Sequence, residues 1–122
     1  MGERPHKRLK VWQSAVEVVE LTYRLTEQFP KAEQFGLVAQ MRRAAVSIPT
    51  NIAEGAARRS TKEALQFYFV ARGSLSELDT LTDVSQRLRL NTDGDYKAYV
   101  DKMTETSLLL QGLITHNQRR SV

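Results

Sequence analysis

Residues 40–55 read QMRRAAVSIPTNIAEG, and this stretch decides the fold of the chain. One apolar row runs through it at spacings of three, four, three and four residues, as on one face of an α-helix: Val38, Met41, Ala45, Ile48 and Ile52. Pro49 lies inside this row, where it removes a backbone donor and crowds the carbonyl group four residues earlier. Because the spacing continues in phase through Pro49, the pattern predicts one kinked helix from residue 31 or 33 to about residue 57. The alternative is two shorter helices, with Ser47 capping the second.

Three further helical patterns surround this stretch. The first covers residues 9–29 and ends before Pro30. Another covers residues 60–90 and opens on STKE at 60–63, which has the form of a capping box. The last follows a predicted turn at residues 91–94 and continues towards the end of the chain. No segment alternates with period two for long enough to predict a strand, so we expect an all-α, up-and-down antiparallel four-helix bundle with a proline kink in its second helix.

The predicted helix at 60–90 is apolar on more than one side. One row contains Tyr68, Ala71, Leu75 and Leu78, and a second contains Phe67, Val70, Leu81, Val84 and Leu88. A helix that is apolar on nearly all sides has to be covered on nearly all sides. This surplus of apolar surface is a physical motive for assembly, so we expect a homo-oligomer.

We expect Gly55 and Gly73 to have structural roles in the predicted helices. Gly55 falls near the end of its predicted helix, where a residue in the left-handed conformation is common. Gly73 lies inside the next helix, where glycine costs about 1 kcal/mol relative to alanine. We expect Gly73 and Ser74 to offset that cost by letting a neighbouring backbone approach closely.

The composition indicates one globular domain covering residues 1–122, with a basic flexible arm at 1–8 and a frayed tail at 118–122. The net charge is +4, and the first ten residues supply +3 of it, through Arg4, Lys7, Arg8 and Lys10 against Glu3. The chain has no cysteine, no apolar run long enough for a membrane span and no signal-peptide pattern, so we expect a cytoplasmic protein without a membrane partner.

The sequence contains no pattern that indicates catalysis. Its two histidines, His6 and His116, lie in the terminal segments, and no phosphate-binding loop, dinucleotide fingerprint or nucleophile elbow is present. With no cysteine and no paired histidine, a transition-metal site is not expected. We therefore predict no catalytic residue, no metal, no cofactor and no enzymatic activity.

Two motifs carry a family resemblance. The segment RRAAVSIPTNIAEG at 42–55 and the segment ARGSLSEL at 71–78 resemble those of the small four-helix-bundle proteins named after open reading frames in intervening sequences of bacterial 23S ribosomal RNA genes. LKVW at 9–12, FPK at 29–31 and FGL at 35–37 also fit, so the resemblance covers nearly the whole chain. It implies an up-and-down bundle that assembles as a ring-shaped homopentamer. The family's biochemical role is not established. Its name reflects where some of the genes lie and does not describe an activity.

The candidate site residues form two groups. Arg42, Arg43, Arg58, Arg59 and Arg72 are candidates for binding RNA or DNA, because the planar guanidinium group suits phosphate; the alternative is solvated charge and ion pairs between helices. Asn51, Glu54 and Glu77, with Arg58, are candidates for a polar network that sets helix register or a subunit interface, and a ligand site is the alternative. The aromatic residues at 67–69 are interpreted as core or interface.

Three functions remain open at this stage. The leading hypothesis is a non-enzymatic protein that binds RNA or DNA through basic surface gathered by assembly. The alternative is a structural scaffold that binds another protein and has no nucleic-acid role. An enzyme or small-molecule binder would require a polar pocket between helices or at a ring axis.

Overall fold

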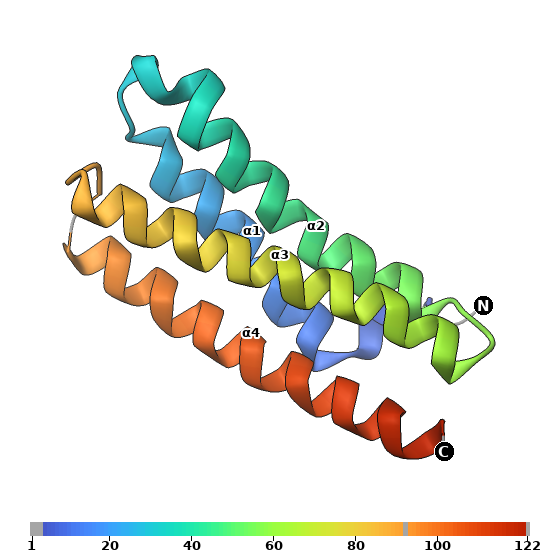
Figure 1. Cartoon of the computed structure of the whole chain (residues 1–122). Coiled ribbons are helices and arrows are strands. Elements are labelled where there is room, and N and C mark those ends of the chain that lie inside the picture. The colour runs from blue at the N-terminus through green and yellow to red at the C-terminus, as the bar shows by residue number, and fades with distance from the viewer. Residues whose placement is uncertain (1–3, 92, 122) are drawn as a thin grey trace.

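The computed structural model describes residues 4–91 and 93–121, and four long helices form most of it (Figure 1). The helices are α1 (Lys10–Glu27), α2 (Ala39–Ala56), α3 (Thr61–Arg87) and α4 (Asp93–Arg120). Three short helical segments accompany them: η1 (Pro5–Arg8), η2 (Lys31–Glu33) and η3 (Gln34–Val38). No strand occurs among the described residues, which confirms the predicted all-α class.

The helices form a four-membered ring in cross-section. Each packs on its neighbour in the chain, and α4 closes the ring against α1. The chain runs back and forth along one axis, so the first described residues and the last turn of α4 lie at the same end of the bundle (Figure 1). The predicted four-helix bundle is therefore confirmed. None of the helices in the described ranges has an apolar stretch long enough to cross a lipid bilayer.

Helix α2 passes through Pro49 without interruption, so the alternative of two separate helices is wrong. The proline ring is buried, and side chains after it bond to carbonyl groups before it. Thr50 Oγ1 donates to the Val46 carbonyl (2.7 Å), and Asn51 Nδ2 donates to the Ser47 carbonyl (2.8 Å). The carbonyl that loses its amide donor to Pro49 is that of Ala45, and these two side-chain bonds add donors to the next two carbonyls of the same turn. The kink itself stays a prediction.

The start predicted for this helix was too early. Residues 31–38 are wound as a 3-10 turn followed by a π turn, and regular α-helix begins only at Ala39. The apolar spacing could not distinguish these windings, because all of them place side chains three to five residues apart on one side.

Both interpretations of the glycines were wrong. No described glycine has a positive φ angle, and Gly55 lies inside α2. A Cβ atom at Gly55 would lie 2.4 Å from Tyr68 Cε1, so the glycine makes room for the Tyr68 ring. At Gly73 no atom outside its own helix lies within 4 Å of the Cβ position. The close approach thus occurs at the end of α2, at Gly55.

Helix α3 ends earlier than predicted, at Arg87. Arg89 adopts a left-handed conformation (φ 59°), and the Leu90 amide donates back to the Ser85 carbonyl at 3.0 Å. This reversal closes the helix without a glycine. Part of the predicted turn at 91–94 falls on residue 92, which lies outside the described residues, and Asp93 already belongs to α4.

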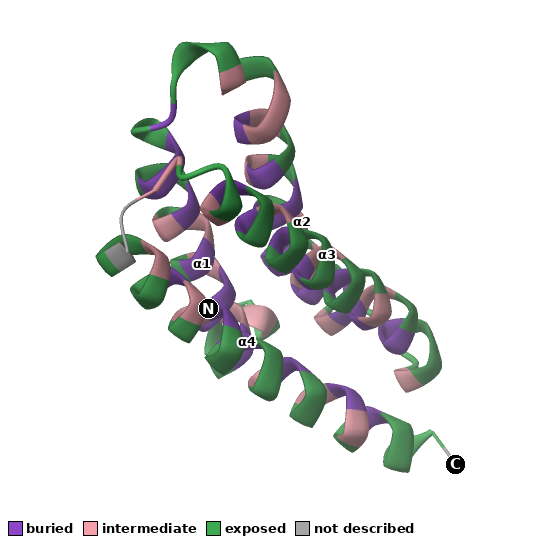
Figure 2. Cartoon of the chain, turned by 60° about the vertical axis from the view of Figure 1, so that its left-hand side comes forward, coloured by how far each residue is buried: buried purple, intermediate pink, exposed green. Residues whose placement is uncertain are grey.

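The core is made by the inward faces of all four helices, whose buried residues face one another in Figure 2. On α3 the row of Tyr68, Ala71, Leu75 and Leu78 is buried. The second row is only partly covered, because it lies on the outer side of α3: Val70 is 52% exposed and Leu88 57% exposed. A single chain therefore leaves the surplus apolar surface of α3 in contact with solvent.

Candidate nucleic-acid interface

Arg42 lies between α1 and α2. Its Nε donates to Thr26 Oγ1 (3.0 Å), and its guanidinium carbon lies 4.3 Å from the centre of the Tyr23 ring. Both partners belong to α1, so Arg42 joins the two helices through a hydrogen bond and a cation–π contact. Arg42 therefore helps to hold α1 against α2 and also carries a positive charge.

Arg58 and Arg72 also stack on aromatic rings. Arg58 lies 4.5 Å from the ring centre of Phe67 and forms an ion pair with Glu54 (2.8 Å). Arg72 lies 5.0 Å from the ring centre of Phe69, on the side of α3 that faces α4. A guanidinium group that stacks by its face keeps its N–H edge available for phosphate.

The side chains of Arg43 and Arg59 are exposed and make no hydrogen bond or ion pair with a described residue. The structure does not collect the five arginines into one patch. Arg42 and Arg58 lie near opposite ends of α2, about 24 Å apart along the axis at 1.5 Å per residue. Arg58 and Arg59 share one end of the bundle, and no described contact joins any two of the five.

Hydrogen bonds do not connect all members of the predicted polar network among the described residues. Asn51 Nδ2 donates to Ser47 Oγ (3.0 Å), and Ser47 Oγ lies 2.7 Å from Ser74 Oγ on α3. Glu54 bonds only to Arg58 among the described residues. Glu77 is exposed, one turn beyond Ser74, and makes no hydrogen bond or ion pair within the described ranges. The two serines that join α2 to α3 were missed, although both lie inside the family motifs.

The basic arm is described from Arg4 onwards. Residues 5–8 form η1, which packs against α1 and α2. The Lys7 carbonyl accepts a hydrogen bond from Gln13 Nε2 (2.9 Å), and the rings of His6 and Trp12 meet edge to face. The charges of Lys7 and Lys10 therefore lie at the entry to α1, on exposed side chains.

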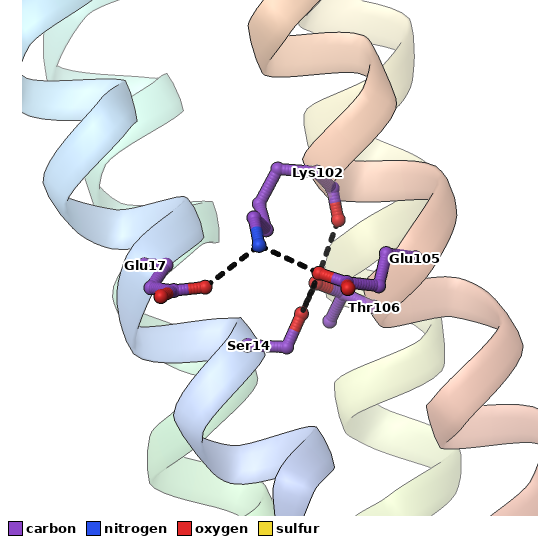
Figure 3. Close-up of polar contacts among 5 residues, drawn as sticks. All are labelled: Ser14, Glu17, Lys102, Glu105 and Thr106. Atoms are coloured by element: carbon purple, nitrogen blue, oxygen red, sulfur yellow. Dashed lines mark hydrogen bonds and ion pairs between the residues drawn. The ribbon is translucent and has the colours of Figure 1, made fainter.

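A cluster of charged side chains joins α1 to α4 (Figure 3). Lys102 Nζ lies 2.8 Å from Glu17 and 2.6 Å from Glu105. Hydrogen bonds to Glu105 and Glu17 raise the pKa of Lys102, and the same ammonium group lowers the pKa of Glu105. Beneath them, Ser14 and Thr106 bond to each other across the two helices (2.6 Å). No motif in the sequence pointed to this cluster, and its contacts fix α1 on α4.

Among the described residues, no group of three or more His, Asp or Glu side chains could hold a metal ion. Comparison with known protein families gives a match to the 23S rRNA-intervening sequence protein family over residues 7–112. The chain belongs to this family. The match includes all five candidate arginines and both motifs, and it confirms the family suggested by those motifs. The end of α4, with His116 and Arg120, lies beyond the matched residues. Comparison with curated proteins gives no match.

Proposed function

We propose that this member of the family is a non-enzymatic cytoplasmic protein that self-associates and binds RNA or DNA through arginines displayed on the assembly. The observation that carries the proposal is the uncovered apolar row on α3, beside which two of the candidate arginines lie.

The uncovered row has the spacing of a helix-packing seam. Val70, Val84 and Leu88 are 52%, 39% and 57% exposed, and Phe67 and Leu81 are half-buried. These positions, with Ser74 and Glu77 between them, recur every three or four residues along α3. Exposed apolar rows of this length on a soluble domain are typical of protein–protein contact. A second copy of the chain is the occupant we propose.

Assembly through this row would concentrate positive charge. Arg58 stacks on Phe67, which is the first residue of the row. Arg43 lies on α2, one turn before Ser47. The Ser47 hydroxyl contacts Ser74, which lies on α3 between the apolar residues of the row. Each added copy contributes a net charge of +4, and the affinity for a polyanion grows with the number of phosphates contacted.

The assembly is tested by multi-angle light scattering after size exclusion. The wild-type protein should have a mass that is a multiple of 13.9 kDa. Val70→Glu/Val84→Glu should yield monomers, because two carboxylates would be buried in the contact. Leu108→Glu is the matched control, since Leu108 is 71% exposed on α4, away from this row. A monomeric wild-type protein would refute self-association.

Nucleic-acid binding is tested by fluorescence anisotropy with labelled duplex DNA and structured RNA at several salt concentrations. Arg43→Ala/Arg59→Ala removes two charges that make no described contact, so the fold should be unaffected. The slope of log K against log salt for the duplex should fall by about 0.9 for each phosphate that the variant no longer neutralises. Arg24→Ala/Arg119→Ala removes the same charge elsewhere and should leave the slope nearly unchanged. Equal slopes in the two variants would remove Arg43 and Arg59 from the site.

A protein partner is the second candidate function. Phe35 on η3 is 90% exposed, and a large exposed aromatic side chain at the tip of a bundle is a suitable anchor for another protein. The absence of nucleic-acid binding at about 50 mM salt, where phosphate contacts are strong, would favour this scaffold function.

A further inference from the structure

A cavity of about 400 Å³ lies at the end of the bundle where the first described residues meet the last turn of α4. Its walls come from four parts of the chain: the segment containing Pro5, the end of α2, the start of α3 and the end of α4. Most of the charged and polar side chains in these walls take no part in holding the helices together.

The register of α1 against α4 explains why a cavity forms here. Ser14 contacts Thr106, and Thr22 contacts Tyr99, so the first residue of α1 lies level with about residue 110 of α4. Helix α4 continues for about ten more residues, or about 15 Å, to Arg120. Helix α1 does not cover this length, and the segment with Pro5 and Leu9 covers only part of it.

Among the described residues, every Arg, Lys, His, Asp or Glu side chain that lines the cavity is of a basic type. They are Arg58, Arg59, His116 and Arg120, and no Asp or Glu among the described residues lines it. Arg58 is paired with Glu54, whereas Arg59, His116 and Arg120 bond to no described residue. The carboxyl ends of α2 and α4 each oppose this field with about half an elementary charge, so together they offset about one of the guanidinium groups. The start of α3 adds the positive end of its own helix dipole at Thr61.

Two buried polar side chains complete the walls. Tyr68 is only 4% exposed, its ring lies against Gly55, and its hydroxyl bonds to no described residue. Burial raises the pKa of Tyr68, which keeps this hydroxyl available as a donor. Asn117 is 8% exposed, and its Nδ2 donates to the Leu113 carbonyl, which leaves its amide oxygen to accept a further bond. The Tyr68 hydroxyl and the Asn117 amide oxygen are not enclosed by protein atoms, so they can offer a donor and an acceptor to a ligand in the cavity.

We propose that this cavity binds a phosphate monoester of a nucleotide, with the phosphate at Arg59 and Arg120 and the sugar or base towards Tyr68 and Asn117. The volume lies in the range of small-molecule sites, and a nucleoside monophosphate supplies both the anion and the hydroxyl and amino donors. Three other cavities between the described residues are each lined by an acidic side chain as well as a basic one. The inference goes beyond the proposed function, because a free nucleotide can fill the cavity whether or not the protein binds long nucleic acid.

The test is calorimetric titration of the full chain with AMP, inorganic phosphate and adenosine. AMP should bind saturably with one site per chain, inorganic phosphate should bind more weakly, and adenosine should not bind in the same concentration range. Saturable binding of adenosine as tight as that of AMP, or no saturable binding of AMP, would overturn the proposal.

Variants locate the site. Arg59→Ala and Arg120→Ala should each weaken AMP binding by about tenfold, since each removes a charge-assisted hydrogen bond to phosphate. Arg119→Ala is the matched control, because it removes the same charge from the neighbouring position, which does not line the cavity. Tyr68→Phe keeps the ring against Gly55 and should weaken AMP binding without changing the unfolding temperature. Equal losses in the Arg119 and Arg120 variants would indicate general charge attraction and would overturn the site.

Competition distinguishes the sources of the phosphate. A short single-stranded RNA with a 5′-phosphate should displace AMP if the cavity takes the end of a strand, and the same RNA with a 5′-hydroxyl should not. Displacement of AMP by neither RNA assigns the cavity to free nucleotides. AMP binding without binding of long nucleic acid would refute only the proposed function, and the converse result would refute only this inference.

Discussion

Replacing Gly55 by alanine tests the closest approach between α2 and α3. The added Cβ atom would lie 2.4 Å from Tyr68 Cε1, 2.9 Å from Tyr68 Cδ1 and 3.0 Å from the Ala64 carbonyl oxygen. An ordinary contact needs at least about 3.4 Å, so the ring has to move by about 1 Å, yet Tyr68 is only 4% exposed. Overpacking of this kind costs about 3 kcal/mol, whereas alanine gains about 1 kcal/mol of helix propensity over glycine. The expected net loss of unfolding free energy is about 2 kcal/mol.

The assay is urea denaturation followed by far-UV circular dichroism, at one protein concentration because self-association would contribute to stability. A thermal melt followed by the same signal should give a melting temperature lower by about 8 °C, at about 4 °C for each kcal/mol in a domain of this size. Gly73→Ala and Gly112→Ala are matched controls, since no atom outside their own helices lies within 4 Å of either Cβ position. Each control should gain about 0.5–1 kcal/mol. A Gly55→Ala protein as stable as these controls would refute the tight contact.

Three further substitutions test other contacts. Arg89→Gly should raise the unfolding free energy by about 0.5–1 kcal/mol, because glycine relieves the left-handed strain at φ 59°; a loss in urea denaturation would contradict this. Burial raises the pKa of Tyr99 to about 12, so the folded protein retains a proton that the unfolded chain loses near pH 10.0. Stability should therefore fall by about 2–3 kcal/mol as the pH rises from 10.0 to about 12, and Tyr99→Phe should remove this part of the pH dependence. Thr106→Val removes the 2.6 Å partner of the buried Ser14 hydroxyl and should cost about 1–2 kcal/mol, whereas Ser14→Ala/Thr106→Val should recover part of the loss; simple addition of two losses would argue against the bond.

Several local features were correctly predicted because they depend on neighbouring residues. The N-cap at the start of α3 is an example: Ser60 Oγ accepts from the Glu63 amide at 3.0 Å, which is one of the two bonds of the predicted capping box. Helical spacing likewise placed Tyr68, Ala71, Leu75 and Leu78 in one row along a face of α3. In α2 the apolar spacing correctly predicted that the helix continues through Pro49.

The candidate site shows where such reasoning stops. Residue chemistry singled out the arginines, but the stacking of Arg42 on Tyr23 and of Arg72 on Phe69 depends on rings from other turns or other helices. Arg59 and Arg120 are separated by almost half of the chain and line one cavity only because α4 extends past the start of α1.

The sequence by itself determined the helices, most of their boundaries and the polarity of their faces, since spacing and capping act over a few residues along one helix. The tertiary structure decided which apolar row of α3 is buried, that Gly55 rather than Gly73 admits a neighbour, and which charges share a cavity. Those outcomes depend on how far helices remote in the chain are shifted along and rotated against one another, and that arrangement comes from packing the whole core at once.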